Sequence, residues 1–191
     1  METKDAILGR RSIRKYTDKA VSDEALEQVL EAALMAPSGI NLQPWFFTVV
    51  RSPEKRRELF EITGQVFGKF RPVLEKRFQR NPEAVEETKE FLNSMGGAPV
   101  VILVFMLKPD YEDETTVISG ISAAIENLCL RAYDLGMGTC WMTAALRAGS
   151  GEELHQHFAP DKGRFLGMVT LGYPDISPNP PTRRPGRVVY I

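Results

Sequence analysis

The sequence predicts an α+β protein, in which helices flank a central mixed or antiparallel sheet of four to five strands. Two observations predict a layered structure of the mixed α/β or α+β type. Apolar runs of strand length recur along the chain, and stretches with helical periodicity separate them. The length of 191 residues adds a third, because it fits one domain, 1–191, with enough interior for a hydrophobic core.

The predicted strands are short apolar runs. The most apolar of them, residues 100–107, is too short to cross a bilayer, so it predicts a buried strand over 100–106. Further strands are predicted at 46–50, 139–143 and 165–171. Residues 188–191 would add a last strand, to this sheet or to that of a neighbouring subunit.

The first half of the chain also carries helix signals. Residues 4–10 predict a short helix, and residues 11–16 predict an extended segment. Ser22 is a typical N-cap for a helix that ends before Pro37. Another helix is predicted to begin at Pro53, since proline is favoured in the first turn.

In the second half, residues 64–97 predict a charged helical hairpin, which we interpret as a lid. Its solvated face is marked by Glu83, Glu86, Glu87, Lys89 and Glu90. Residues 115–135 predict a long helix that is apolar on nearly every side, so it should be buried or packed against a partner. Ser150 and Glu153 have the spacing of a capping box. From residue 173 on, the chain is rich in proline and arginine, and we expect a C-terminal arm over 173–191.

Composition narrows the classes of function. The formal net charge of −1 gives no general attraction to nucleic acid or to an anionic membrane. Cys129 and Cys140 are too few for a disulfide framework, and they fit free buried thiols in a reducing cytoplasm. No targeting segment is visible at the start. His155 and His157 would face apart on a helix, so no metal site is predicted.

The first chemical signal is the run Arg10-Arg11-Ser12-Ile13-Arg14. Arginine binds phosphate through a two-pronged fork, and a serine hydroxyl adds one more donor. In an extended segment Arg10, Ser12 and Arg14 would share one face, which would suit a phosphorylated ligand. By itself the run fits a solvated surface better than a binding site. A second basic cluster at the other end of the chain, Arg183, Arg184 and Arg187, could meet the first around one anion.

The second signal is the irregular loop 37–45. Ser38 and Gly39 allow tight turns, and Asn41 and Gln43 carry amides that both donate and accept hydrogen bonds. The edge of a flavin ring presents acceptors and a donor, so such amides suit it. Asn and Gln are also ordinary turn residues, and for the loop alone this interpretation is the better one.

Taken together, four blocks in order resemble the nitroreductase family. They are the run 10–14, the loop 37–45, the helix end and strand 127–141, and the C-terminal pieces 167–174 with 183–185. The blocks lie at fitting distances between residues 4 and 190, which makes them more specific together than any one alone. The resemblance implies an FMN-dependent NAD(P)H oxidoreductase, a cytoplasmic homodimer with FMN at the subunit interface.

The resemblance also implies roles for single residues. Arg10, Arg11 and Ser12 would hold phosphate and ribityl oxygens. Arg14 would lie beside the pyrimidine edge, where a cation raises the reduction potential of the flavin. The other subunit would lend Pro37, Ser38, Gly39, Asn41 and Gln43. A backbone N–H from Met142, Thr143 or Ala144 would face N5, and Arg183 with Arg184 would close around the phosphate.

Two departures from the family leave points open. Many relatives have glycine or an acidic-glycine pair where Thr143 and Ala144 stand, so the amide that faces N5 is undecided. The tail is short, so Arg187 is an alternative to Arg183 at the phosphate. No side chain is predicted to act as a catalytic acid or base.

The expected reaction moves hydride from NAD(P)H through N5 to a small nitroaromatic or quinone acceptor, with ping-pong kinetics. Other flavin chemistry is an alternative: enone reduction, dehalogenation or fragmentation of the flavin. A non-catalytic FMN-binding module and a nucleic-acid-binding protein are alternatives of other classes, and the net charge argues against the latter.

Overall fold

The computed structural model describes residues 1–107, 111 and 113–191. Its centre is a four-stranded antiparallel sheet with the order β1-β2-β4-β3. The strands are β1 (Trp45–Val50), β2 (Val100–Met106), β3 (Gly138–Met142) and β4 (Phe165–Gly172). The predicted α+β class is confirmed, with an antiparallel rather than mixed sheet. Residues 188–191 form no strand within the chain and are exposed, so pairing with a neighbour stays a prediction.

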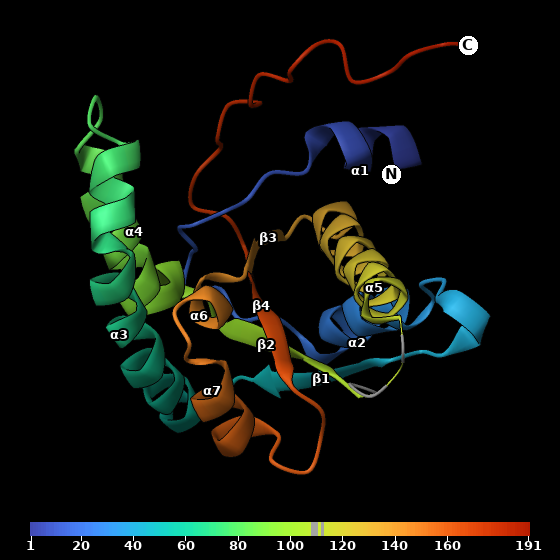
Figure 1. The fold of residues 1–191 in the computed structure, drawn as a ribbon, viewed down its shortest axis with the longest axis horizontal. Coiled ribbons are helices and arrows are strands. Elements are labelled where there is room, and N and C mark those ends of the chain that lie inside the picture. Colours follow the sequence, from blue (N-terminus) through green and yellow to red (C-terminus); the bar gives the residue numbers. More distant parts are fainter. Residues whose placement is uncertain (108–110, 112) are drawn as a thin grey trace.

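Helices cover both faces of this sheet (Figure 1). One face packs against α2 (Asp23–Leu34) and α5 (Glu114–Asp134), and the other against α3 (Pro53–Arg77), α4 (Glu83–Ser94), α6 (Ala144–Arg147) and α7 (Gly151–Phe158). Strand β2 shows why two cores form. Alternate side chains point to opposite faces of a strand, so Leu103 and Phe105 enter one core and Ile102 and Val104 the other.

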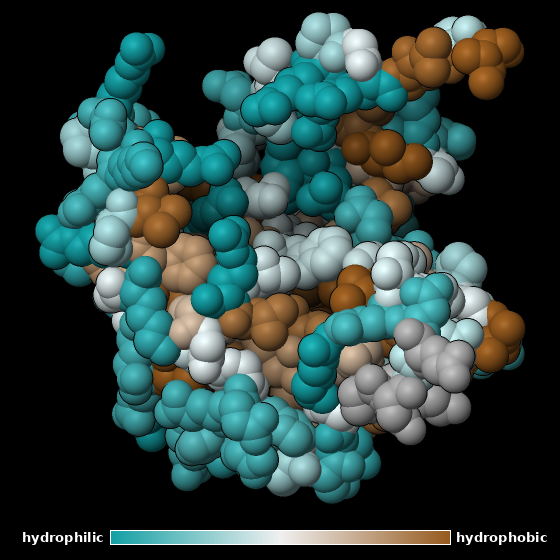
Figure 2. All heavy atoms as spheres, viewed as in Figure 1, coloured by the Kyte–Doolittle hydropathy of each residue, from teal (hydrophilic) through white to brown (hydrophobic). Residues whose placement is uncertain are grey.

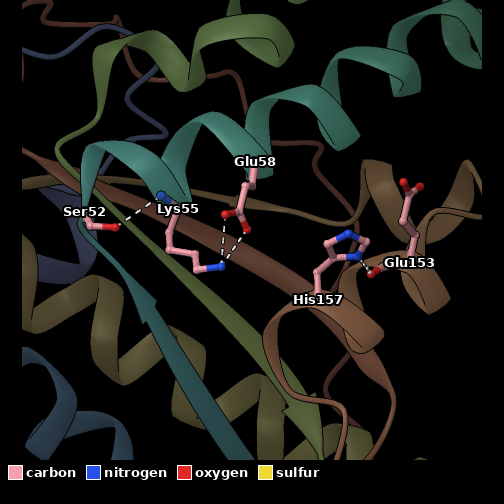
Figure 3. A network of polar contacts seen from close by, with 5 residues as sticks. All are labelled: Ser52, Lys55, Glu58, Glu153 and His157. Carbon is pink, nitrogen blue, oxygen red and sulfur yellow. Dashed lines mark hydrogen bonds and ion pairs between the residues drawn. The ribbon is translucent and has the colours of Figure 1, made fainter.

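Helix ends agree with the sequence at two positions and differ at a third. The Ser22 hydroxyl accepts the Ala25 N–H at 3.2 Å, and the Ser52 hydroxyl accepts the Lys55 N–H at 3.1 Å (Figure 3). The predicted capping box at Ser150 is wrong, because its hydroxyl makes no cap hydrogen bond. Ser150 is buried and has φ −89° and ψ 5°, outside the extended region that a capping side chain needs.

The N-terminal part of the chain covers the β3 edge of the sheet. Helix α1 (Thr3–Gly9) packs on α5, and the predicted extended segment follows it. Ser12 bridges to Thr139 of β3 in parallel, and Tyr16 bridges to Pro174 just after β4. Consequently both ends of the chain meet along one edge of the sheet (Figure 1).

The predicted helical hairpin is present as α3 and α4. Its aromatic residues serve the core in different degrees: Phe67 is buried, while Phe70 and Phe78 are partly buried against the same cluster. Among the described residues, no helix is both long enough and apolar enough to cross a membrane.

Candidate functional site

The segment from Arg10 to Arg14 is held close to β3. The Ile13 N–H donates to the Thr139 carbonyl at 2.9 Å, and the Ile13 side chain is buried. This close approach depends on Gly138, where an added Cβ would lie 2.5 Å from Ile13 Cγ1. The segment is therefore held by its backbone hydrogen bond and by the close approach that Gly138 allows. Its polar side chains are not needed to hold it in place.

Two cavities open beside this segment. The arginine cavity, of about 480 Å³, lies between α1, the end of α5 and the tail, and it is lined by Arg10 and Arg11 among others. The α4 cavity, of about 780 Å³, lies between the segment and α4, and Ser12 and Arg14 line it. Ile176 and Pro178 of the tail border both cavities, so the two are neighbours.

The expected sharing of one face by Arg10, Ser12 and Arg14 is thus only partly right. Ser12 and Arg14 line the same cavity, but Arg10 lines the other together with Arg11. The reason is local, since Arg10 is the C-cap of α1 and its Nε lies 3.2 Å from Glu126 Oε1 on α5. Strand-like alternation begins only after this residue.

Arg11 has hydrogen-bond partners in the backbone. Its Nη1 donates to the carbonyl oxygens of Leu8 at 2.8 Å and of Arg10 at 2.7 Å. These carbonyls belong to the end of α1, where a helix leaves acceptors unpaired and favours a cation. The guanidinium is consequently oriented before any ligand arrives, and it keeps further N–H donors.

Arg14 is exposed on the α4 side. Its Cζ lies 6.0 Å from the centre of the Phe91 ring, at the outer limit of a cation–π contact. Its backbone rests on Gly96, which has φ +65° and whose carbonyl accepts the Tyr16 N–H at 2.9 Å. A side chain at Gly96 would collide with the Arg14 carbonyl oxygen. The turn after α4 therefore helps to fix the backbone position of Arg14.

The end of β3 leads from this sheet edge into α6. Met142 is half-buried, Thr143 is exposed, and Ala144 is the first residue of α6. In the part of the chain that the structure describes, the Thr143 N–H has no hydrogen-bond partner. It is therefore available to an acceptor from outside the chain.

Loop 37–43 lies elsewhere in the molecule. Ser38 packs against Gly120 and Gly39 against Thr116, at the start of α5, where a separate cavity of about 340 Å³ opens. Figure 1 shows the loop projecting past α5, on the side opposite to α4. The structure does not bring Pro37, Ser38, Gly39, Asn41 and Gln43 to the Arg10–Arg14 segment of the same chain.

The backbone of this loop is strained. Ile40, Asn41 and Gln43 have φ of 48°, 55° and 47°, in the left-handed region that non-glycine residues rarely adopt. The Ser38 hydroxyl accepts the Gln43 N–H at 2.9 Å, and the Gln43 side-chain amide donates to Asn41 Oδ1 at 3.1 Å. Ile40 is 81% exposed, so this loop presents an apolar side chain to solvent.

The C-terminal arm passes the arginine cavity and then leaves the surface. Residues 174–180 supply part of its lining. Arg183, Arg184 and Arg187 are exposed, and none has a hydrogen bond or ion pair with another described residue. The chain ends in the apolar residues 188–191, which project from the upper right of Figure 2.

Other candidate groups lie away from this site or are inert. Cys129 and Cys140 are free and buried, and burial raises the pKa of the Cys129 thiol to about 11. His155 Nε2 lies 2.9 Å from the Lys162 carbonyl oxygen, and His157 Nδ1 lies 2.9 Å from that of Glu153 (Figure 3). Among the described residues, no three His, Cys, Asp or Glu side chains are arranged to hold a metal.

Sequence reasoning missed the wall that α4 contributes. Glu87 and Glu90 are exposed, as expected of a solvated face, but together with Phe91 they also line the α4 cavity. Their spacing of three residues on a helix could have signalled a shared direction. The sequence did not indicate which element the two glutamates face, because that element comes from a distant part of the chain.

Gly138→Ala is expected to lower the free energy of unfolding by about 1–3 kcal/mol, because the added Cβ overpacks against Ile13. It should also loosen the Arg10–Arg14 segment and weaken binding of an anionic ligand there. Urea denaturation measures the first effect. Gly68→Ala is the control, since an added Cβ there meets nothing within 4 Å and alanine favours a helix. Equal stability of the two variants would contradict the prediction.

Comparison with known proteins places these features in a family. The sequence profile of the Nitroreductase family matches residues 7–173. An NADPH-flavin oxidoreductase of Vibrio harveyi is 28% identical over 196 residues, covering 98% of this chain and 72% of the relative.

Solved structures of flavoproteins are also similar to this chain. A nitroreductase with bound FMN from Bacteroides fragilis superimposes with a TM-score of 0.75 at 25% identity, covering 100% of this chain and 99% of the other. A BluB-like flavoprotein from Clostridium difficile gives 0.71 at 29% identity, covering 97% and 95%.

Proposed function

The chain belongs to the nitroreductase family, and from this premise we propose that it is an FMN-dependent oxidoreductase that transfers hydride from NAD(P)H to a small acceptor. The observation that carries the proposal is the placement of Arg10, Arg11, Ser12 and Arg14 along two neighbouring cavities at one sheet edge. Ligand-binding cavities of this size commonly hold cofactors.

The donors of the site fit the parts of FMN. Arg10 and Arg11 offer charged N–H groups that suit a phosphate, and the Ser12 hydroxyl suits a ribityl oxygen. Arg14 would stand at the pyrimidine edge of the ring. When bound, FMN supplies a ring that accepts hydride from one partner and passes it to another. Arg183 and Arg184, with Arg187 as the alternative to Arg183, would close over the phosphate.

The end of β3 would contribute a backbone donor. A backbone N–H from the segment Met142 to Ala144 would face N5, and among the described residues the N–H groups of both Thr143 and Ala144 lack a backbone partner. Arg14 would act through its charge, because a cation near N1 and O2 favours the form of the ring that carries more negative charge. Neither group needs to gain or lose a proton.

We propose a homodimer in which loop 37–43 of one chain completes the site of the other. The loop is largely exposed, and it lies away from its own chain's arginines. The α5 surface beside it leaves Ile118 39% exposed, and the apolar tail end has no cover within the chain. A second copy would bury these surfaces and bring the Asn41 and Gln43 amides to the ring.

We further propose ping-pong kinetics, in which NAD(P)H and the acceptor use the α4 cavity in turn. Helix α4 forms one wall of that cavity, which supports a covering role for the hairpin within residues 64–97. A nitroaromatic or a quinone would suit the aromatic lining. The free, buried cysteines support a reducing, cytoplasmic setting.

The purified protein is expected to be yellow and to be bleached by NADH or NADPH under anaerobic conditions. Nitroaromatics or quinones should restore the colour. Parallel double-reciprocal lines would support the ping-pong scheme, and intersecting ones would contradict it. A yellow protein that neither nicotinamide bleaches would favour a module that binds FMN without catalysis.

A mixture of two defective variants tests the shared site. One carries Arg10→Ala with Arg11→Ala, and the other carries Asn41→Gly with Gln43→Gly, which keeps the left-handed backbone but removes the amides. Coexpressed, they should regain activity at about a quarter of all sites, since half the dimers are mixed and each has one intact site. No regain, with mixed dimers confirmed by mass, would mean that each chain builds its site alone.

A further inference from the structure

The α4 cavity has two unlike walls. One is the extended segment, with Ser12, Arg14 and Lys15, and the other is α4, with Glu87 and Glu90. The lining also includes aromatic and apolar side chains: Phe78, Phe91, Ile176 and Pro178. Phe91 is only 6% exposed, so most of its ring is packed in the protein.

The positive and negative side chains of the two walls do not balance once existing ion pairs are taken into account. Lys15 Nζ lies 3.2 Å from Asp175 Oδ2, so that cation is already paired. In the described chain, Glu87 and Glu90 take part in no ion pair, whereas Glu86 pairs with Lys89 at 3.3 Å outside the cavity. Among the described residues that line the cavity, Arg14 is the remaining cation.

The proposed function assigns Arg14 to the flavin, and this leaves two carboxylates facing the space where an acceptor would stack. We propose that Glu87 and Glu90 determine acceptor specificity, favouring neutral and cationic aromatic acceptors over anionic ones. Both carboxylates are exposed, so an anionic group beside them would meet two like charges whose repulsion is partly screened by salt. This inference rests on the proposed function.

The same wall is compatible with NAD(P)H. The negative charges of that molecule lie on its phosphates, remote from the nicotinamide. The ring itself is neutral before it gives up hydride and cationic afterwards. Carboxylates near the ring would therefore favour the change in charge that hydride donation brings.

Binding of unreactive analogues to the FMN-loaded protein tests the inference without catalysis. Benzoate, benzamide and benzyltrimethylammonium are titrated by calorimetry. In Glu87→Gln with Glu90→Gln, we expect the affinity for benzoate to rise about five- to tenfold relative to benzamide, and that for the cation to fall by a similar factor. Raising the salt concentration should shrink these differences in the wild type, because exposed charges are screened.

Glu83→Gln with Glu86→Gln is the matched control. It removes the same two charges from the same helix, at positions that do not line the cavity. It should leave the benzoate-to-benzamide ratio within about twofold of the wild type, because surface charges outside the cavity are screened.

A second measurement compares reaction rates and so does not require that the affinity of a weak ligand be determined. Protein reduced photochemically is reoxidised by 4-nitrobenzoate or by 4-nitrobenzamide, and the ratio of the two rates is compared between variants. If neither compound nor a quinone reoxidises the wild type, the proposed function fails. If both do and the ratio is the same in the wild type, the Glu87/Glu90 variant and the control, the inference fails alone.

Discussion

Arg14→Ala is expected to lower the two-electron reduction potential of bound FMN by about 30–60 mV, which corresponds to about 1.4–2.8 kcal/mol. The physical reason is the loss of the cation that we propose stands at the pyrimidine edge, in a partly enclosed cavity. The fold should be retained, because the Arg14 side chain is exposed and its one side-chain hydrogen bond, to the Ser12 carbonyl, is 3.5 Å long. Equilibration of the flavin with a dye of known potential measures the shift.

Two further variants separate charge from structure. Arg14→Lys keeps the charge and should recover most of the potential. Lys15→Ala removes a neighbouring cation that is already paired with Asp175, and it should leave the potential nearly unchanged. Equal shifts in Arg14→Ala and Lys15→Ala would show a general field effect and would refute the role given to Arg14.

The double variant Arg10→Ala with Arg11→Ala is expected to weaken FMN binding by at least about a hundredfold. Hydrogen bonds to charged groups contribute about 1.5–3 kcal/mol each, and two phosphate-binding side chains would be lost. Quenching of FMN fluorescence during titration of the apoprotein measures the affinity. The far-ultraviolet circular dichroism should stay as in the wild type, since neither side chain belongs to the core.

Glu126→Gln is the matched control for this variant. It breaks the ion pair of Arg10 with α5 but keeps both arginines. A partly exposed pair contributes at most about 1 kcal/mol, so FMN affinity should change less than about fivefold. If Glu126→Gln lost as much affinity as the double variant, the arginines would act by holding α1 on α5 rather than by binding phosphate.

Much of the fold was predictable because its signals are local. The strand over 100–106 was predicted with its observed bounds, since seven consecutive apolar residues bury both faces. The helix ending before Pro37 and the long helix near 115–135 follow from periodicity and breakers, and the observed bounds differ by one or two residues. The capping box at Ser150 failed because the spacing of residue types does not fix the backbone angles of the first one.

The sequence by itself predicted the segments of the candidate site: the basic run 10–14, the amide-bearing loop 37–43 and the strand end over 142–144. These carry their chemistry in their side chains or amides, whatever surrounds them. Tertiary structure alone decided their grouping. It split Arg10 from Ser12 and Arg14, and it turned Glu87 and Glu90 into a cavity wall. The physical reason is that grouping depends on strand order and on packing between residues far apart in the chain, which no local pattern encodes.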